Sequence, residues 1–79
     1  MDPKDIQRYL RRQPFAPFRL VTSGGTTYDI KHPEMVLLSR RAVDIGLSSD
    51  PADTIAEHIV TVSLVHVQRL EAAGSTAEK

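Results

Sequence analysis

The segment Phe18-Arg19-Leu20-Val21-Thr22-Ser23-Gly24-Gly25-Thr26-Thr27-Tyr28-Asp29-Ile30 decides the fold. Residues 18–22 are rich in the aromatic and β-branched types that favour strands, and residues 27–30 alternate between polar and apolar side chains. Gly24 and Gly25 lie between these two stretches, and glycine readily adopts the positive φ that tight hairpin turns demand. The segment therefore predicts an antiparallel β-hairpin.

The chain before the hairpin predicts one short helix. Asp2 is a suitable N-cap, and Pro3 is a residue type favoured at the first helical position. An apolar stripe at helical spacing follows, formed by Ile6, Tyr9 and Leu10. Because Pro14 disfavours helical geometry in the residue before it, we expect the helix to end near Arg12.

The chain after the hairpin predicts further short strands. His32-Pro33-Glu34 interrupts the pairing, because proline lacks the hydrogen-bond donor of the ladder. Strands are predicted over residues 35–38, 42–47, 59–62 and 67–70, with one turn of 3₁₀ helix over residues 63–66. The first of these strands is wholly apolar, so we expect it to be covered on both faces. In the second, Val43, Ile45 and Leu47 should face inward and Asp44 outward. Asp50-Pro51 predicts a turn or a short helical cap.

These elements predict a mainly β domain over residues 1–71 with one N-terminal α-helix, followed by a flexible tail over residues 72–79. Five short antiparallel strands usually curl into a small barrel, with the helix packed on one end or edge. The expected plug of the barrel is Ile6, Leu10 and Phe15. The expected interior consists of Phe18, Leu20, Tyr28, Ile30, Met35, Leu37, Val43, Ile45, Ile59, Val62, Leu64 and Val67.

Composition excludes several kinds of function. The 79 residues contain no cysteine, which rules out disulfides, thiolate zinc sites and thiol nucleophiles. Ten basic and ten acidic residues give a formal net charge of zero, so there is no overall attraction to nucleic acid or to a membrane surface. The apolar runs are far shorter than the roughly 20 residues of a membrane span. We therefore expect a cytoplasmic protein with no membrane partner.

Two resemblances add to this reading. Gln13-Pro14-Phe15-Ala16-Pro17-Phe18-Arg19, His32-Pro33-Glu34 and the closing stretch 62–67 resemble a P-F-x-P-F-R…H-P-E pattern of small uncharacterised bacterial proteins, over roughly residues 5–71. That group implies no activity. The order of a short helix, short strands and a tight turn before the last strand is similar to the Sm-like RNA-binding barrels and to SH3-like barrels. The Sm-like resemblance implies RNA binding, although the Asp-x-x-x-Asn-type loop of Sm proteins has no counterpart between Ile30 and Arg41.

The residues that could perform chemistry do not form a known pattern. No spacing among His32, His58 and His66 matches a metal-ligand motif, so we predict neither a metal nor a cofactor. The serines Ser39, Ser48, Ser49 and Ser63 lack the strand–helix elbow typical of a nucleophile. The carboxylate pairs Asp29 with Asp44 and Asp50 with Asp53 are better explained as solvated strand faces and loop caps. We predict that the protein is not an enzyme and has no catalytic residues.

The charges are unevenly distributed along the chain. The candidate contacts for phosphate or an acidic partner are Arg8, Arg11, Arg12, Arg40 and Arg41. Residues 44–57 carry only acidic charges, at Asp44, Asp50, Asp53 and Glu57. We favour the alternative that the arginines form a solvated surface that keeps a small protein soluble, because a nucleic-acid binder usually has a net basic excess. Pairing between the basic and acidic regions of two copies would promote self-association.

Three functional hypotheses follow. The first is a binding or adaptor module that acts through protein–protein contacts, with itself or another protein, using open strand edges near Val36, Val60 and Val65. The second is nucleic-acid (RNA) binding through the arginines, which the zero net charge disfavours. The third is a small-molecule sensor that uses a crevice between helix and barrel near Phe15, Phe18 and Tyr28.

Overall fold

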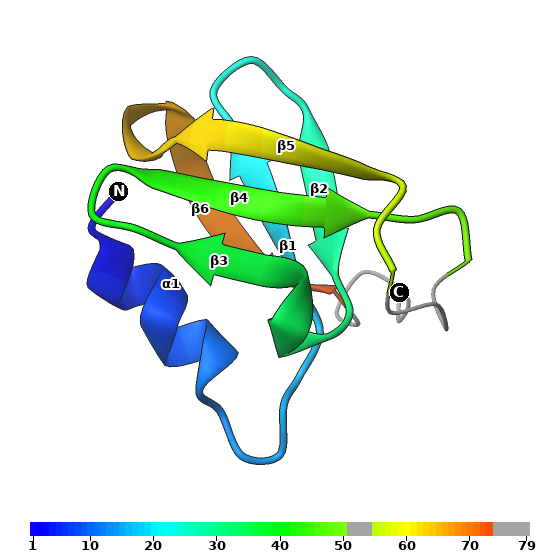
Figure 1. The fold of residues 1–79 in the computed structure, drawn as a ribbon. Helices are drawn as coiled ribbons and strands as arrows, with labels where there is room; N and C mark the ends of the chain where they lie inside the picture. The colour runs from blue at the N-terminus through cyan, green and yellow to red at the C-terminus, as the bar shows by residue number, and fades with distance from the viewer. Residues whose placement is uncertain (51–54, 74–79) are drawn as a thin grey trace.

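The computed structural model describes residues 1–50 and 55–73, and these contain one α-helix, six strands and two 3₁₀ turns (Figure 1). Two stretches lie outside the described residues. They are residues 51–54, which include Pro51 and Asp53, and residues 74–79, which are most of the predicted tail. In chain order the elements are α1 (Pro3–Leu10), β1 (Phe18–Thr22), β2 (Thr27–Ile30), η1 (Pro33–Met35), β3 (Val36–Leu38), β4 (Ala42–Leu47), β5 (His58–Ser63), η2 (Leu64–His66) and β6 (Val67–Ala72).

The helix α1 begins as the sequence predicts. The side chain of Asp2 accepts a hydrogen bond from the Lys4 backbone N–H at 2.9 Å, and Pro3 occupies the first turn. The helix ends at Leu10, slightly before the expected Arg12, and Arg11 forms its C-cap. Ile6 is completely buried, so one side of this short helix is anchored in the interior.

The predicted hairpin is confirmed as β1 and β2. The two strands pair antiparallel from Phe18 opposite Ile30 to Val21 opposite Thr27. Gly25 in the turn has φ +93°, the positive value that favours glycine. The turn is closed at its base by Thr22, whose backbone N–H donates to the Thr26 carbonyl at 2.9 Å.

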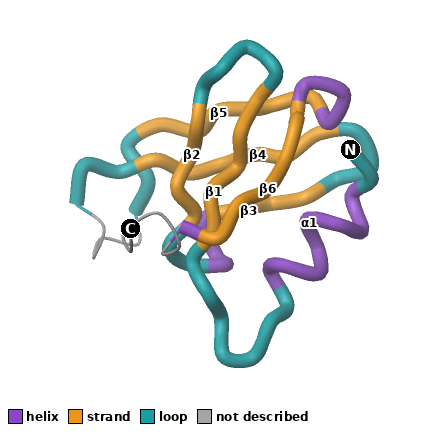
Figure 2. The backbone as a smooth tube through the Cα atoms, turned by 180° about the vertical axis from the view of Figure 1, so that it is seen from behind, coloured by secondary structure: helices purple, strands orange, loops and turns teal. Residues whose placement is uncertain are grey.

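The expected count of five strands and the expected barrel are not what the structure shows. Its strands form two antiparallel sheets of three, in the orders β2-β1-β6 and β3-β4-β5 (Figures 1 and 2). The 3₁₀ turn that begins at Pro33 separates β2 from β3, and the turn from Leu64 to His66 separates β5 from β6. Each turn carries the chain from one sheet to the other. Among the described residues no strand of one sheet pairs with a strand of the other, so the two sheets do not close into one barrel.

The core lies where the two sheets and α1 meet. Its buried members are Ile6, Phe18, Leu20, Ile30, Val43, Ile45, Leu64 and Val67, all of which the sequence analysis had placed in the interior or its plug. The placement of Leu37 and Ile59 in the interior is wrong, because these side chains are 72% and 71% exposed. The strand at Leu37 is therefore covered on one face only, and α1 contacts it from the side.

Candidate functional site

Two of the five candidate arginines already have partners on α1. The Nη2 atom of Arg8 lies 3.1 Å from the Asp5 carboxylate, in an exposed ion pair one turn of helix apart. The Arg12 guanidinium lies 4.3 Å from the centre of the Tyr9 ring, which is cation–π geometry. Both contacts use part of the positive charge that a phosphate would need.

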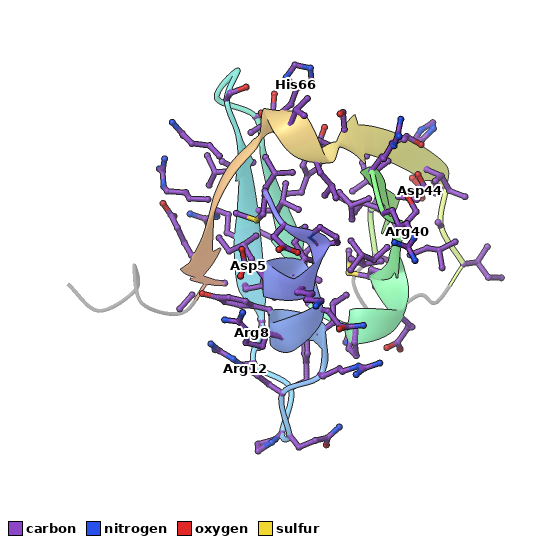
Figure 3. The ribbon with its side chains drawn as sticks, turned by 90° about the vertical axis from the view of Figure 1, so that its left-hand side faces the viewer. Asp5, Arg8, Arg12, Arg40, Asp44 and His66 are labelled. Atoms are coloured by element: carbon purple, nitrogen blue, oxygen red, sulfur yellow. The ribbon has the colours of Figure 1, made fainter. Side chains whose placement is uncertain are left out.

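The remaining candidate arginines occupy other places. Arg11 follows α1 as its C-cap, and Arg40 and Arg41 form the turn between β3 and β4. Figure 3 shows Arg8 and Arg12 beside α1, with Arg40 apart from them and in the same part of the view as Asp44. The five predicted contacts thus come from two segments of the chain, the end of α1 with the residues after it and the β3–β4 turn.

The three histidines are all exposed and come from different elements. His32 precedes η1, His58 begins β5 and His66 ends η2. The backbone carbonyl of His66 accepts a hydrogen bond from the Ser23 N–H at 2.8 Å, while its side chain points outward at the top of Figure 3. Within residues 1–50 and 55–73, no three histidine and carboxylate side chains gather as a cation site would require.

The serine hydroxyls have local partners. Ser39 Oγ donates to the Ala42 carbonyl at 3.0 Å and accepts from the same residue's N–H, which fixes the turn between β3 and β4. Ser49 Oγ donates to Glu57 at 2.8 Å and joins the two ends of the loop between β4 and β5. These bonds explain both serines as parts of turns and loops.

The outward face of the β3-β4-β5 sheet carries a feature that the sequence analysis does not predict. Leu37 on β3 lies opposite Asp44 on β4, and Asp44 lies opposite Thr61 on β5. Ile59 on β5 lies opposite Gly46 at the next outward position of β4. Two aliphatic side chains, each more than 70% exposed, thus flank a carboxylate on one sheet face.

This face borders a hollow of about 630 Å³. At one end of it, Ala56 packs over β4, because a Cβ atom on Gly46 would come within 3.1 Å of the Ala56 Cβ. The lining residues come from β2, η1, β3, β4, the following loop and β5: Asp29, Lys31, His32, Glu34, Met35, Leu37, Asp44, Gly46, Leu47, Ser48, Ser49, Asp50, Ala56 and Ile59.

The charged groups around the hollow are mainly acidic. Asp29 accepts a hydrogen bond from Arg19 Nε at 2.8 Å, and this bond, together with the charge of Asp29, raises the pKa of the Arg19 guanidinium above its usual value. Asp44 accepts a hydrogen bond from the Thr61 hydroxyl at 2.6 Å. Glu34 and Asp50 complete the set of four lining carboxylates. The hollow therefore combines aliphatic walls with a negative rim.

Two of the three residues that we expected to border a small-molecule crevice, Phe15 and Phe18, lie in a cluster of aromatic rings. Phe18 packs against Tyr9 and Phe15, with ring centroids 5.1 and 6.1 Å apart. The hollow beside Leu37 and a second, adjoining hollow near Pro17 both lie away from these rings. The tilted ring contacts add to burial in holding α1 and its connector against the core.

Sequence reasoning did not find the hollow. Asp29 and Asp44 were interpreted as solvated strand positions, while Leu37 and Ile59 were assigned to the core. The available signal was the alternation along residues 42–47, because Asp44 and Gly46 share the outward face and identify their cross-strand neighbours as outward too.

Comparison with known proteins finds no matching family model, no matching curated protein and no matching solved structure. Among residues 1–50 and 55–73, no helix has both the length and the apolar character that crossing a membrane requires. The site must therefore be interpreted from its own geometry.

Proposed function

We propose that this protein is a non-enzymatic binding or adaptor module that acts through protein–protein contacts on the outward face of β3-β4-β5. The observation that carries the proposal is the exposure of Leu37 and Ile59, 72% and 71%, on that one face. Exposed aliphatic side chains beside a hollow are typical of surfaces that a partner covers. Burying them would remove apolar area from water without disturbing the separate core.

The position of β5 supports the same proposal. This strand pairs with β4 on one side and is the last strand of its sheet. The outer edge of such a strand offers backbone N–H and C=O groups to an added strand. A second copy of the chain is one partner that the edge fits, because two copies of β5 could pair about a two-fold axis.

Two further expectations belong to the proposal. The order of a helix, a hairpin and a 3₁₀ turn before a last strand that returns to β1 supports an Sm-like or SH3-like architecture. We also propose a cytoplasmic location, with which a chain without cysteine is compatible. Cell fractionation tests the location.

Site-specific photo-crosslinking tests the binding surface. A photoreactive phenylalanine derivative is placed at position 37 or 59, or at the exposed control position Gln68 on β6. We expect protein adducts from the first two positions and not from the third. Equal adducts from all three positions, adducts with nucleic acid alone, or none at all would contradict the proposal.

Light scattering tests whether the partner is a second copy. Weak functional self-association becomes visible at roughly tens of micromolar. If the unchanged protein has the mass of a dimer or larger assembly and Ile59→Ser has the mass of one chain, the β5 edge is the contact. The mass of a single chain throughout this range would exclude self-association and direct the crosslinking towards another protein.

A further inference from the structure

Asp44 is a carboxylate placed between apolar side chains. Asp44 on β4 is paired across the sheet with Leu37 on β3 and with Thr61 on β5, and Ile59 is the next outward residue of β5. The hydrogen bond that Asp44 accepts comes from the Thr61 hydroxyl at 2.6 Å, which is a neutral donor. This contact orients the carboxylate but does not neutralise its charge.

The surroundings strengthen this negative charge. Among the described lining residues, Glu34 and Asp44 contribute carboxylates, and Lys31 is the one lysine or arginine. Asp29 is compensated by Arg19 at 2.8 Å. A concave surface with an excess of one sign of charge attracts groups of the opposite sign. The hollow therefore favours a cation that approaches together with an apolar group.

We infer that this face binds a segment of another protein in which a lysine or arginine lies next to an aliphatic residue. The inference rests on the proposed function and adds the chemistry of the partner. The aliphatic side chain packs between Leu37 and Ile59, and the cation pairs with Asp44. An extended segment can lie across this face, because Leu37, Asp44 and Ile59 occupy outward positions of three neighbouring strands.

A second copy of this chain fits the face less well. Its own Arg19-Leu20 and Arg69-Leu70 pairs lie within β1 and β6, where Arg19 pairs with Asp29 at 2.8 Å and Arg69 pairs with Glu71 at 2.5 Å. Those contacts would have to break before the arginines could reach the carboxylates of another copy. The charge arrangement therefore favours a different protein as the occupant.

Selection from displayed hexapeptides of random sequence tests this inference directly. The full chain is the bait, and the probe for later measurements is the most enriched peptide, made synthetically with blocked ends and a fluorescent label. We expect enrichment of Lys or Arg beside Leu, Ile or Val. Enrichment of acidic peptides, or no enrichment at all, would overturn the inference.

Asp44→Asn provides the decisive variant. An amide oxygen can still accept the Thr61 hydrogen bond, so the local geometry is kept while the charge is removed. We expect the labelled peptide to bind roughly threefold more weakly and with less dependence on salt, as for a partly exposed ion pair. Asp5→Asn makes the same change of charge on α1 and should leave binding unchanged. Equal losses in both variants would overturn the inference.

The combined outcomes separate this inference from the proposed function. If crosslinking gives protein adducts at position 37 or 59 while the peptide selection shows no preference for basic–aliphatic sequences, the face binds proteins of other chemistry, and only the inference fails. If light scattering instead gives the mass of a dimer for the unchanged protein and of a single chain for Asp44→Asn, a second copy occupies the face, and the inference of a different protein is overturned. If neither protein adducts nor peptide binding is observed, the inference and the proposed function are both wrong.

Discussion

The ring of Phe18 is 1% exposed and packs against the rings of Tyr9 and Phe15. We expect Phe18→Ala to lower the free energy of unfolding by about 3–5 kcal/mol, because it removes buried apolar area and leaves a cavity. Urea denaturation followed by circular dichroism measures the change. Phe18→Leu keeps most of the volume and should cost less, and an unchanged midpoint for Phe18→Ala would contradict the assignment of this ring to the core.

Gly25 illustrates a backbone constraint on a single residue. At φ +93° an L side chain is strained, so Gly25→Val should destabilise the protein by about 1–2 kcal/mol. Gly24 is its matched control, because its φ is not positive and a Cβ there meets nothing within 4 Å. Thermal unfolding should show a clearly lower midpoint for Gly25→Val than for Gly24→Val. Similar midpoints for the two variants would mean that the turn has another conformation.

Single residues also show where sequence reasoning succeeds and where it stops. Gly25 was predictable because positive φ is a local property that few residues tolerate. Leu37 and Ile59 were not, because hydrophobicity alone does not say which face of a strand meets the interior. That information depends on pairing with β4, where Asp44 marks the outward side. The candidate arginines were found as residues, but their separation depends on the tertiary fold.

At the level of elements, α1 depends on its first turn. The helix has eight residues, too few for stability on its own, so its cap should matter. Asp2→Ala removes the side chain that accepts from the Lys4 N–H, and we expect a loss of about 0.5–2 kcal/mol in the free energy of unfolding. Chemical denaturation measures it. Asp2→Asn preserves the acceptor and should be close to neutral, so an equal loss in both variants would point to the charge instead of the cap.

The elements most accurately predicted are those with local signals. β1 over residues 18–22 and β4 over residues 42–47 have the expected bounds, and the 3₁₀ turn before the last strand is confirmed. The turn η1 was predicted only as an interruption, because Pro33 shows where a ladder stops but not what replaces it. The pairing of β6 with β1 joins segments far apart in the sequence, which no local pattern encodes.

At the level of the whole molecule, the net charge is zero, but basic and acidic residues are concentrated in different parts of the chain. The arginines on α1 have local partners, and Arg40 lies apart from them (Figure 3). We therefore expect no electrophoretic shift of mixed RNA or DNA oligonucleotides by the protein at low salt. A shift that weakens steeply as salt is raised would contradict this and would support phosphate contacts. Loss of such a shift in Arg40→Ala would identify the β3–β4 turn as the contact.

The place of β1 in the middle of its sheet has a consequence for synthesis. Its first neighbour, β2, follows it almost immediately, but its other neighbour, β6, ends only at Ala72. Forming this second pairing requires closure of a long loop, which slows folding. While the chain is still on the ribosome, β1 therefore has one bare side until nearly all of the domain has emerged. An unpaired strand edge can add a strand from another chain, so the order of synthesis leaves the hairpin open to wrong pairing until β6 emerges.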